Sequence, residues 1–483
     1  MTSPVKNSPG NTHAPPERVL STLNEDGSRR WLTPRPMPGR FMSGRRIVAY
    51  LLILIFTAIP SISLNGRPLV LLDLPTRHFT IFGMTFLPTD TLLLAFFVVA
   101  IFVGVFLLTA LLGRIWCGWA CPQTVYLEFV FRPIERFFEG TPGRRLRPWQ
   151  GNPVGTVAKY VVYLAISLYL AHTFLAYFVG VERLAVWVRQ SPFEHPAPFV
   201  VMLVVTALML FDFSFFREQT CIVACPYGRM QSVMLDRNSL IVTYDTQRGE
   251  PRGPLKRARR PEQADVSLPV VASGGDCIDC GMCTVCCPTG IDIREGLQME
   301  CVGCAQCIDA CDAVMTKLHR ALGLIRYSSQ AAVSGESRRL LRPRVVLYPL
   351  VLLALIVGFL ITLSFTGGFD LSVLRGLGSP FTNRPDGTIG NTVKIKIVNR
   401  RDTEATYAIV AEGIEGLVVS AEENPVTLAA GEVRTVPITL VAPRGALDDG
   451  GKQITVSVTD DSGQVRTRPF QLVGPAGGLR IGP

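Results

Sequence analysis

The sequence predicts a multidomain protein with an α-helical membrane part, an inserted cysteine-rich domain and an all-β C-terminal domain. Three observations predict this class. Five apolar stretches are each close to the roughly 20 residues that cross a bilayer. All 13 cysteines lie between Cys117 and Cys311, grouped in short motifs. The chain beyond Phe369 contains no cysteine and alternates apolar with polar residues.

The composition supports a membrane protein. Of the 483 residues, 48% are hydrophobic and 18% are charged, whereas about 25% charged residues is usual in a soluble protein. The net charge is +10, but the arginines gather between particular apolar stretches. We therefore expect membrane lipid, and no nucleic acid, among the partners of this chain.

Five membrane spans are predicted. They are Ile47–Leu64, Thr91–Leu112, Val157–Val179, Phe199–Phe216 and Val345–Phe365. The first is the shortest and contains Pro60, which leaves its end uncertain. Residues 1–46 before it are polar and rich in proline, which is not the pattern of a cleavable signal peptide.

Basic residues predict the orientation of the spans. They precede the first span, separate the second from the third, and precede the fifth: Arg29, Arg30, Arg35, Arg40, Arg45, Arg46; Arg132, Arg136, Arg144, Arg145, Arg147; Lys256, Arg257, Arg259, Arg260, Arg338, Arg339, Arg342 and Arg344. The first and third loops hold only Arg67, Arg77, Arg183 and Arg189. Because basic loops stay in the cytoplasm, we expect a cytoplasmic N-terminus and an external C-terminus.

The C-terminal part shows the period-2 pattern of half-buried strands. The pattern is clearest at Val393–Val398, Val433–Val441 and Ile454–Val458. Short strands at this spacing over a stretch of about 100 residues predict an immunoglobulin-like sandwich, here without a disulfide. No catalytic constellation is visible in this part.

Two cysteine runs of the same spacing lie between the fourth and fifth spans. They are Cys277, Cys280, Cys283 and Cys287, followed by Pro288, and Cys301, Cys304, Cys307 and Cys311. This is the bacterial two-cluster ferredoxin pattern, in which the fourth cysteine of each run ligates the other cluster. We predict two [4Fe–4S] clusters. The first ligand set is Cys277, Cys280, Cys283 and Cys311, and the second ligand set is Cys287, Cys301, Cys304 and Cys307.

Two zinc sites are the alternative for these runs. Zinc ribbons usually separate two pairs of cysteines, whereas each run here has three close cysteines and a distal fourth, which favours iron–sulfur clusters. Cys286 falls outside the expected spacing, and we interpret it as a small buried side chain. The second run has Asp312 where the first has Pro288.

Two further motifs, CGWACPQ and CIVACPYG, follow the second and fourth spans. They contain what we call the membrane-edge cysteines: Cys117, Cys121, Cys221 and Cys225. Positions i and i+4 share one face of a helix, so four thiols converge if the two helix ends are neighbours. Pro122 and Pro226 should mark where the chain leaves regular helix.

Three interpretations of the membrane-edge cysteines remain open. They are packing of small side chains, a thiol or disulfide pair, and a soft-metal or redox site, since thiolates favour Cu(I), zinc and iron–sulfur centres. The neighbouring Arg114, Arg217 and Arg229 should lower the thiol pKa values. Haem is not expected, because only His172 of five histidines lies in a predicted span. Asp212 is costly in lipid, which marks a functional group or an interfacial position.

These motifs together resemble the CcoG/FixG/Rdx family of bacterial cytochrome c oxidase accessory proteins. The resemblance extends from about Trp31 to the end of the chain, and Cys286 departs from the family pattern. It implies a bacterial inner-membrane reductase that converts Cu(II) to Cu(I) while cbb3-type oxidase is assembled. Copper would be substrate or bound ion at Cys117, Cys121, Cys221 and Cys225.

The expected partners are a copper chaperone or transporter, assembly factors of the cbb3-type oxidase, and an electron donor that the sequence does not identify. Two other functions remain open. One is a quinol dehydrogenase-type subunit that feeds a periplasmic reductase, and the other is a non-enzymatic redox-sensing assembly scaffold.

The predicted domains follow from these assignments. They are a cytoplasmic tail (1–46), spans one to four (47–240), a cytoplasmic ferredoxin-type domain (241–342), the fifth span (343–366) and a periplasmic immunoglobulin-like domain (367–483). The predicted fold class is thus an α-helical membrane domain of five spans with an inserted two-cluster ferredoxin-like domain and a C-terminal all-β immunoglobulin-like sandwich.

Overall fold

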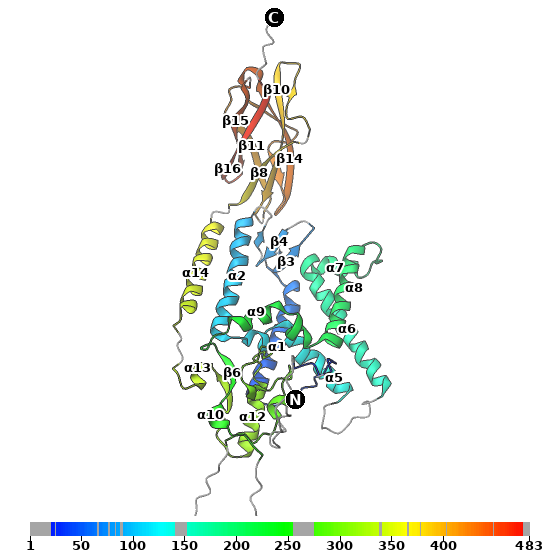
Figure 1. Ribbon diagram of the computed structural model, residues 1–483. Coiled ribbons are helices and arrows are strands. Elements are labelled where there is room, and N and C mark those ends of the chain that lie inside the picture. Colours follow the sequence, from blue (N-terminus) through cyan, green and yellow to red (C-terminus); the bar gives the residue numbers. More distant parts are fainter. Residues whose placement is uncertain are drawn as a thin grey trace, which may run out of the picture. The chain divides into compact units, whose positions relative to one another are not determined.

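A computed structural model shows how these parts fold (Figure 1). The structure describes residues 21–24, 26–64, 67–75, 78–82, 84–86, 90–140, 152–254, 275–337, 341–364, 367–376, 378–401, 403–447 and 449–476. Of the orientation residues named above, Arg77, Arg144, Arg145, Arg147, Lys256, Arg257, Arg259, Arg260, Arg338 and Arg339 lie outside this range. The chain divides into two compact units, Met1–Pro88 with Phe97–Leu355, and Thr89–Phe96 with Ile356–Pro483.

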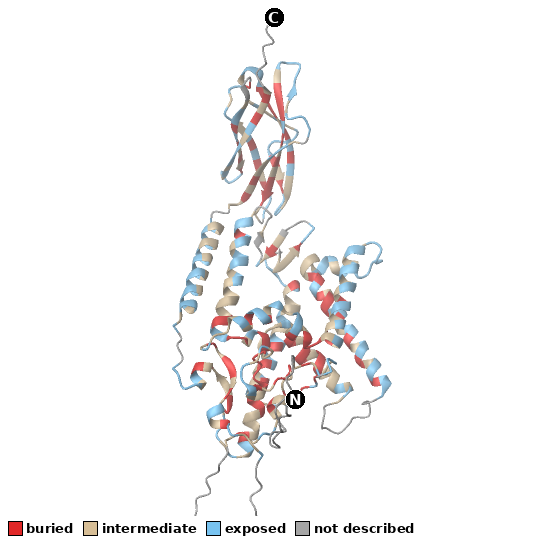
Figure 2. Cartoon of the chain, viewed as in Figure 1, coloured by how far each residue is buried: buried red, intermediate tan, exposed pale blue. Residues whose placement is uncertain are grey.

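Five helical segments in the described chain are long and apolar enough to cross a membrane, as predicted. They are Arg40–Ser61, Thr91–Leu112, Pro153–Val179, Pro196–Phe216 and Pro343–Ser364. They contain α1 (Arg40–Ala58), α2 (Thr91–Leu112), α6 (Pro153–Val179), α8 (Pro196–Phe211) and α14 (Pro343–Ser364). In α2 and α14 most side chains are not buried (Figure 2), as expected of helices whose surroundings are lipid.

The first span begins earlier than the sequence predicted. Helix α1 starts at Arg40, seven positions before Ile47, and the last turn of this span is the 3₁₀ helix Ile59–Ser61. Arg45 would normally end an apolar span, but here the side chain is fully buried and its Nε donates to the Gly118 carbonyl over 2.8 Å. Tertiary contact therefore extends the helix beyond the apolar stretch.

Short elements connect the long helices of the first unit. Between α1 and α2 lie β1 (Ser63–Leu64), β2 (Arg67–Pro68), β3 (Val70–Asp73), β4 (His78–Ile81) and β5 (Met84–Phe86), with β3, β4 and β5 in one antiparallel sheet. After α2 come α3 (Ile115–Trp119), α4 (Pro122–Tyr126), a π-helix (Leu127–Phe131) and α5 (Arg132–Phe138). Helix α7 (Val181–Trp187) joins α6 to α8, and α8 is followed by π-helices at Asp212–Phe216 and Thr220–Ala224 and by α9 (Pro226–Met234).

The cysteine-rich region is closed by a pair of strands from its two ends. Strand β6 (Ile241–Tyr244) pairs antiparallel with β7 (Ile325–Ser328). Between them lie α10 (Thr246–Gly249), α11 (Met282–Val285), the 3₁₀ helix Ile293–Glu295 and α12 (Gln306–Lys317), and α13 (Gln330–Val333) follows β7. The core of this region combines strand residues such as Val242 and Ile325 with the cysteines themselves.

The C-terminal part is the predicted antiparallel sandwich. One sheet has the order β12 (Val418–Ala421), β14 (Val433–Pro443), β10 (Thr388–Asn399), β8 (Phe369–Arg375), with β9 (Thr382–Asn383) also paired to β10. The other has the order β13 (Val426–Leu428), β11 (Ala405–Glu412), β15 (Asp449–Asp460), β16 (Val465–Ala476), and the 3₁₀ helix Arg444–Ala446 follows β14. The three predicted strands lie in β10, β14 and β15, and their alternate side chains form the buried core (Figure 2).

Candidate metal centres

The structure brings the ferredoxin-type cysteines together in the two predicted groups. The Cys311 thiol interacts electrostatically with Cys277, Cys280 and Cys283. The Cys307 thiol interacts instead with Cys304, Cys286, Cys301 and Cys287. These neighbours agree with the crossed pairing inferred from spacing, while the ligand roles themselves stay a prediction.

Local backbone geometry orients these cysteines. Asp279, between Cys277 and Cys280, and Ala305, directly after Cys304, both have left-handed backbones with φ of 54° and 61°. Non-glycine residues rarely adopt this conformation, so each marks a tight reversal that the surrounding structure imposes. Helix α12 begins after Ala305 and carries Cys307 and Cys311 one turn apart.

The second ligand set lines a small cavity, and Cys283 of the first set also contributes to its wall. Cys287, Cys301, Cys304 and Cys307 all contribute to its wall, together with apolar groups such as Val302. Burial raises the pKa of Cys301 to about 12 and that of Cys304 to about 11. Thiols in such surroundings ionise only when a cation compensates the charge, which fits metal ligands rather than free reactive cysteines.

Contrary to the prediction, the two cysteines of each membrane-edge motif do not lie on one face of a helix. Helix α3 contains Cys117 but ends at Trp119, and Cys121 is extended with φ −61° and ψ 127°. Cys225 is extended in the same way, with φ −73° and ψ 107°. The prediction was wrong because a residue before proline avoids helical geometry, while proline suits the first position of a helix. Pro122 and Pro226 therefore begin α4 and α9.

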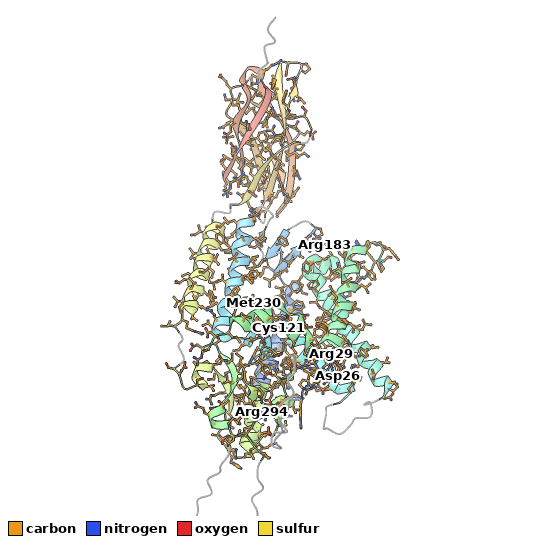
Figure 3. All side chains as sticks on the ribbon, in the orientation of Figure 1. Asp26, Arg29, Cys121, Arg183, Met230 and Arg294 are labelled. Carbon is orange, nitrogen blue, oxygen red and sulfur yellow. The ribbon has the colours of Figure 1, made fainter. Side chains whose placement is uncertain are left out.

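The four thiols converge all the same. Cys221 interacts electrostatically with Cys117, Cys121 and Cys225. In Figure 3 Cys121 lies well away from Arg294, which donates to Asp292 just after the first cysteine run. The membrane-edge cysteines thus form a thiol site apart from the first ligand set, whose Cys283 interacts with Arg294.

Polar groups fix two of these thiols. Cys117 is buried and its Sγ donates to Gln231 Oε1 over 3.0 Å, while Gln231 Nε2 donates to Thr109 Oγ1 over 3.0 Å and to the Tyr227 hydroxyl over 2.5 Å. The Gly228 N–H donates to Cys225 Sγ over 3.4 Å. Sequence reasoning missed Gln231, although it lies three residues after the second motif and is fully buried.

The expected lowering of the thiol pKa values is wrong. Burial raises the pKa of Cys117 and outweighs the opposing charge of Arg114. Burial also raises the pKa of Cys221 to about 12, and neighbouring cysteines add to the effect. Arg217 is paired with Glu135 at 2.8 Å, and Arg229 is exposed. Arg114 and Arg217 make other contacts, which the sequence could not reveal.

The thiol site adjoins the loop of the second ligand set. The Cys117 side chain packs against Val302 and Cys304 in one group of buried apolar side chains. A Cβ at Gly118 would lie 2.7 Å from the Val302 carbonyl oxygen and 2.8 Å from the Cys304 Cα, so only glycine allows this approach. The two sulfur regions therefore meet through van der Waals contact at Gly118.

Hydrogen bonds hold the same contact. Trp119 Nε1 donates to the Tyr327 hydroxyl over 3.1 Å, and this hydroxyl donates to the Gly303 carbonyl over 2.6 Å. Arg114 Nη1 donates to Ser232 Oγ over 3.1 Å and to the Met299 carbonyl. Helix α3 is thus tied to both β7 and the loop between the two cysteine runs.

Helix α12 also caps the first span. The Asp309 carboxylate accepts hydrogen bonds from the backbone N–H groups of Phe41 at 3.2 Å and Met42 at 2.7 Å. A Cβ at Gly39 would lie 2.2 Å from Asp309 Cγ, so glycine is required there. The start of α1 is set by a cluster-bearing helix rather than by its own sequence.

A buried ionic network among the membrane helices also contacts the cysteine-rich region, at Pro288. Arg132 Nη2 contacts Glu218 Oε2 at 3.2 Å and the Pro288 carbonyl at 3.3 Å, and Arg132 Nη1 pairs with Glu128. Arg29 joins it through Glu218 at 3.3 Å. Removing one partner of a buried pair would leave an unpaired charge, so Arg29 and Arg132 are not free charges of a loop.

Cys286, His172 and Asp212 each make a local hydrogen bond. Cys286 is fully buried and its Sγ donates to the Cys283 carbonyl over 3.3 Å, as expected of a packing residue. His172 Nδ1 bonds to the Leu168 carbonyl at 2.8 Å. The Asp212 carboxylate accepts a hydrogen bond from the Thr220 hydroxyl and interacts with Cys221.

Comparison with known families gives the same domain order. A 4Fe-4S binding domain matches residues 94–143, a 4Fe-4S dicluster domain matches residues 216–330, and an IG-like fold at the C-terminal of FixG matches residues 359–475. The first match includes Cys117 and Cys121. Fold and site together define an integral-membrane iron–sulfur oxidoreductase of electron transport.

Similarity along the whole chain identifies the family. The chain is 33% identical to nitrogen fixation protein FixG of Rhizobium meliloti, covering 82% of each. It is 32% identical to protein RdxA of Cereibacter sphaeroides, covering 86% of this chain and 89% of that protein. The chain belongs to the FixG/RdxA/RdxB family. A crystal structure of a FixG-related protein from Vibrio parahaemolyticus is 20% identical and covers 23% of this chain and 99% of its own, with a TM-score of 0.21.

Proposed function

We propose that this chain is a cupric reductase. Electrons enter from a donor, and Cu(II) is reduced to Cu(I) at Cys117, Cys121, Cys221 and Cys225. The observation that carries the proposal is the contact of Cys117 with Val302 and Cys304, because it joins the thiol site to the second ligand set. The [4Fe–4S] clusters, when bound, supply one-electron transfer.

The thiol site has the chemistry that this reaction needs. Sulfur ligands stabilise Cu(I) more than Cu(II), so binding at these cysteines favours the reduced product. Gln231 holds Cys117 and the Gly228 N–H holds Cys225, which limits the reorganisation of both thiols.

The cellular setting is part of the proposal. We place the chain in the bacterial inner membrane, with the N-terminus and all cysteines on the cytoplasmic side and the sandwich in the periplasm. The basic segments support this orientation. Cu(I) would pass to a copper chaperone or transporter and to assembly factors of a cbb3-type oxidase. An alkaline phosphatase fusion after residue 365 should be active and one within residues 249–272 inactive, and the reverse pattern would refute the orientation.

Single-turnover kinetics test the reaction itself. Cluster-loaded protein is reduced anaerobically, freed of reductant and mixed with Cu(II) and a Cu(I)-specific chelator. We expect cluster reoxidation and Cu(I) formation at the same rate, with one Cu(I) formed for each electron released. Protein that stays reduced in the presence of Cu(II) would refute the proposal and favour a different acceptor or a scaffold.

A further inference from the structure

A large apolar cavity opens among the membrane helices beside the thiol site. Its volume is about 570 Å³, which lies within the range of small-molecule sites. Helices α1, α3, α4, α6 and α8 all contribute to its wall. Ala120 and Pro122, the two neighbours of Cys121, both line it. A molecule in this cavity would therefore lie next to the thiol site.

The wall of the cavity suits a flat ring with an apolar tail. Phe56 and Tyr177 stack with ring centroids 5.3 Å apart, and Tyr126 meets Phe213 edge to face at 6.4 Å. Trp116 adds a further aromatic surface. Aliphatic side chains from α1 and α8 complete the lining.

Three polar side chains from α4 and the segment after α8 lie in the wall of the cavity. The Tyr126 hydroxyl is buried and has no hydrogen-bond partner in the described part of the chain. Asp212 lies in the same wall, as does Gln123, whose Nε2 donates to the Arg217 carbonyl over 3.1 Å. An unpaired buried hydroxyl is unfavourable, so a ligand with its own polar group would stabilise it. A lipid acyl chain has no such group.

We propose that this cavity binds a membrane hydroquinone, with the ring between the aromatic side chains and the hydroxyl groups at Tyr126 and Asp212. This deepens the proposed function, since it names the class of electron donor. Oxidation of one hydroquinone breaks two O–H bonds and releases two electrons and two protons. The electrons reduce two Cu(II) to two Cu(I), and both protons pass to water.

Occupancy of the cavity can be tested without copper. Full-length, cluster-loaded protein in lipid nanodiscs is irradiated with an azidoquinone, and labelled peptides are identified by mass spectrometry. We expect labelling within residues 116–126 and 208–213 that excess decylubiquinone suppresses. Met209→Trp, which fills the cavity, should lower labelling at least tenfold. Leu203→Trp on the same helix faces outward, with 54% of its surface exposed, and serves as the control. Labelling that decylubiquinone does not suppress, or that Met209→Trp leaves unchanged, would overturn the proposal and indicate a lipid-filled space.

Electron delivery gives a second readout. The rate of Cu(I) formation with duroquinol, above the protein-free rate, is divided by the single-turnover rate of pre-reduced protein. Asp212→Ala and Tyr126→Phe each remove a polar group from the wall of the cavity, and each should lower this ratio about tenfold. Because the denominator measures copper reduction alone, failure of the cupric reductase and failure of the quinol site are separable. An unchanged ratio in both variants would contradict the proposal.

Discussion

The cysteine-rich region and the thiol site at the membrane edge use the same residue in two different ways. In the first, a repeated spacing determines which cysteines meet, and α12 carries two of them one helical turn apart. In the second, two motifs about a hundred residues apart form one site only because the helices after two spans are neighbours. The comparison teaches that local spacing specifies a cluster, whereas a thiol site of this kind depends on tertiary structure.

The largest expected effect lies within the cysteine-rich region, where it tests whether local spacing identifies the cluster ligands. Cys287→Ala should remove the second cluster and about half of the bound iron. Cys286→Ala should leave the iron content unchanged, since Cys286 falls outside the repeated spacing and its Sγ donates to a backbone carbonyl. Iron analysis and the EPR spectrum of reduced protein measure both. If Cys286→Ala is the damaging change, the ligand register is wrong.

A smaller effect is expected where the two sulfur regions touch. Gly118→Ala places a Cβ against the Val302 carbonyl and should cost about 1–3 kcal/mol of unfolding free energy. It should also slow Cu(I) formation, because the thiol site is pushed away from Cys304. Gly104→Ala is the matched control, since nothing lies within 4 Å of a Cβ there. Thermal unfolding and single-turnover rates measure the two effects, and equal behaviour of the two variants would show that the contact is unimportant.

The smallest effect concerns the cap that α12 provides. Asp309→Ala leaves two N–H groups at the start of α1 without their acceptor and should cost about 1 kcal/mol. Asn152→Ala removes a side-chain cap of α6, whose Oδ1 accepts from the Val154 N–H over 3.1 Å, at similar cost. Only Asp309→Ala should also speed loss of iron to a chelator, because only Asp309 belongs to a cluster-bearing helix. Iron loss that is equally fast in both variants would separate α1 from the cysteine-rich region.

Much of the fold could be predicted because it depends on local pattern. Hydropathy located five spans, alternation located β10, β14 and β15, and spacing gave the two groups of cysteines. The start of α1 could not be predicted, since it depends on Asp309, far away in the sequence. The prediction of orientation treated all basic residues as loop charges. Arg45 is instead buried against a carbonyl group and Arg132 against carboxylates.

The geometry of the thiol site depends even more on tertiary contacts that the sequence does not reveal. Its four cysteines were found from their motifs, but their backbone conformation was wrong, because the effect of proline on the preceding residue outweighed helical periodicity. The sign of the pKa shift was also wrong, since burial depends on contacts that sequence neighbours do not reveal. Gln231, Gly118 and Tyr327 matter through tertiary contacts, and nothing in a single sequence separates them from ordinary packing residues.

The most direct test of the central claim is the copper chemistry of the thiol site with both clusters kept intact. Cys117→Ser with Cys121→Ser, and Cys221→Ser with Cys225→Ser, are compared with wild-type protein for iron content, membrane abundance, bound copper and single-turnover Cu(I) formation. We predict that each double variant keeps its iron but loses copper binding and copper reduction, because the eight cluster ligands lie elsewhere. A stable, iron-loaded double variant that still reduces Cu(II) at the wild-type rate would contradict the account.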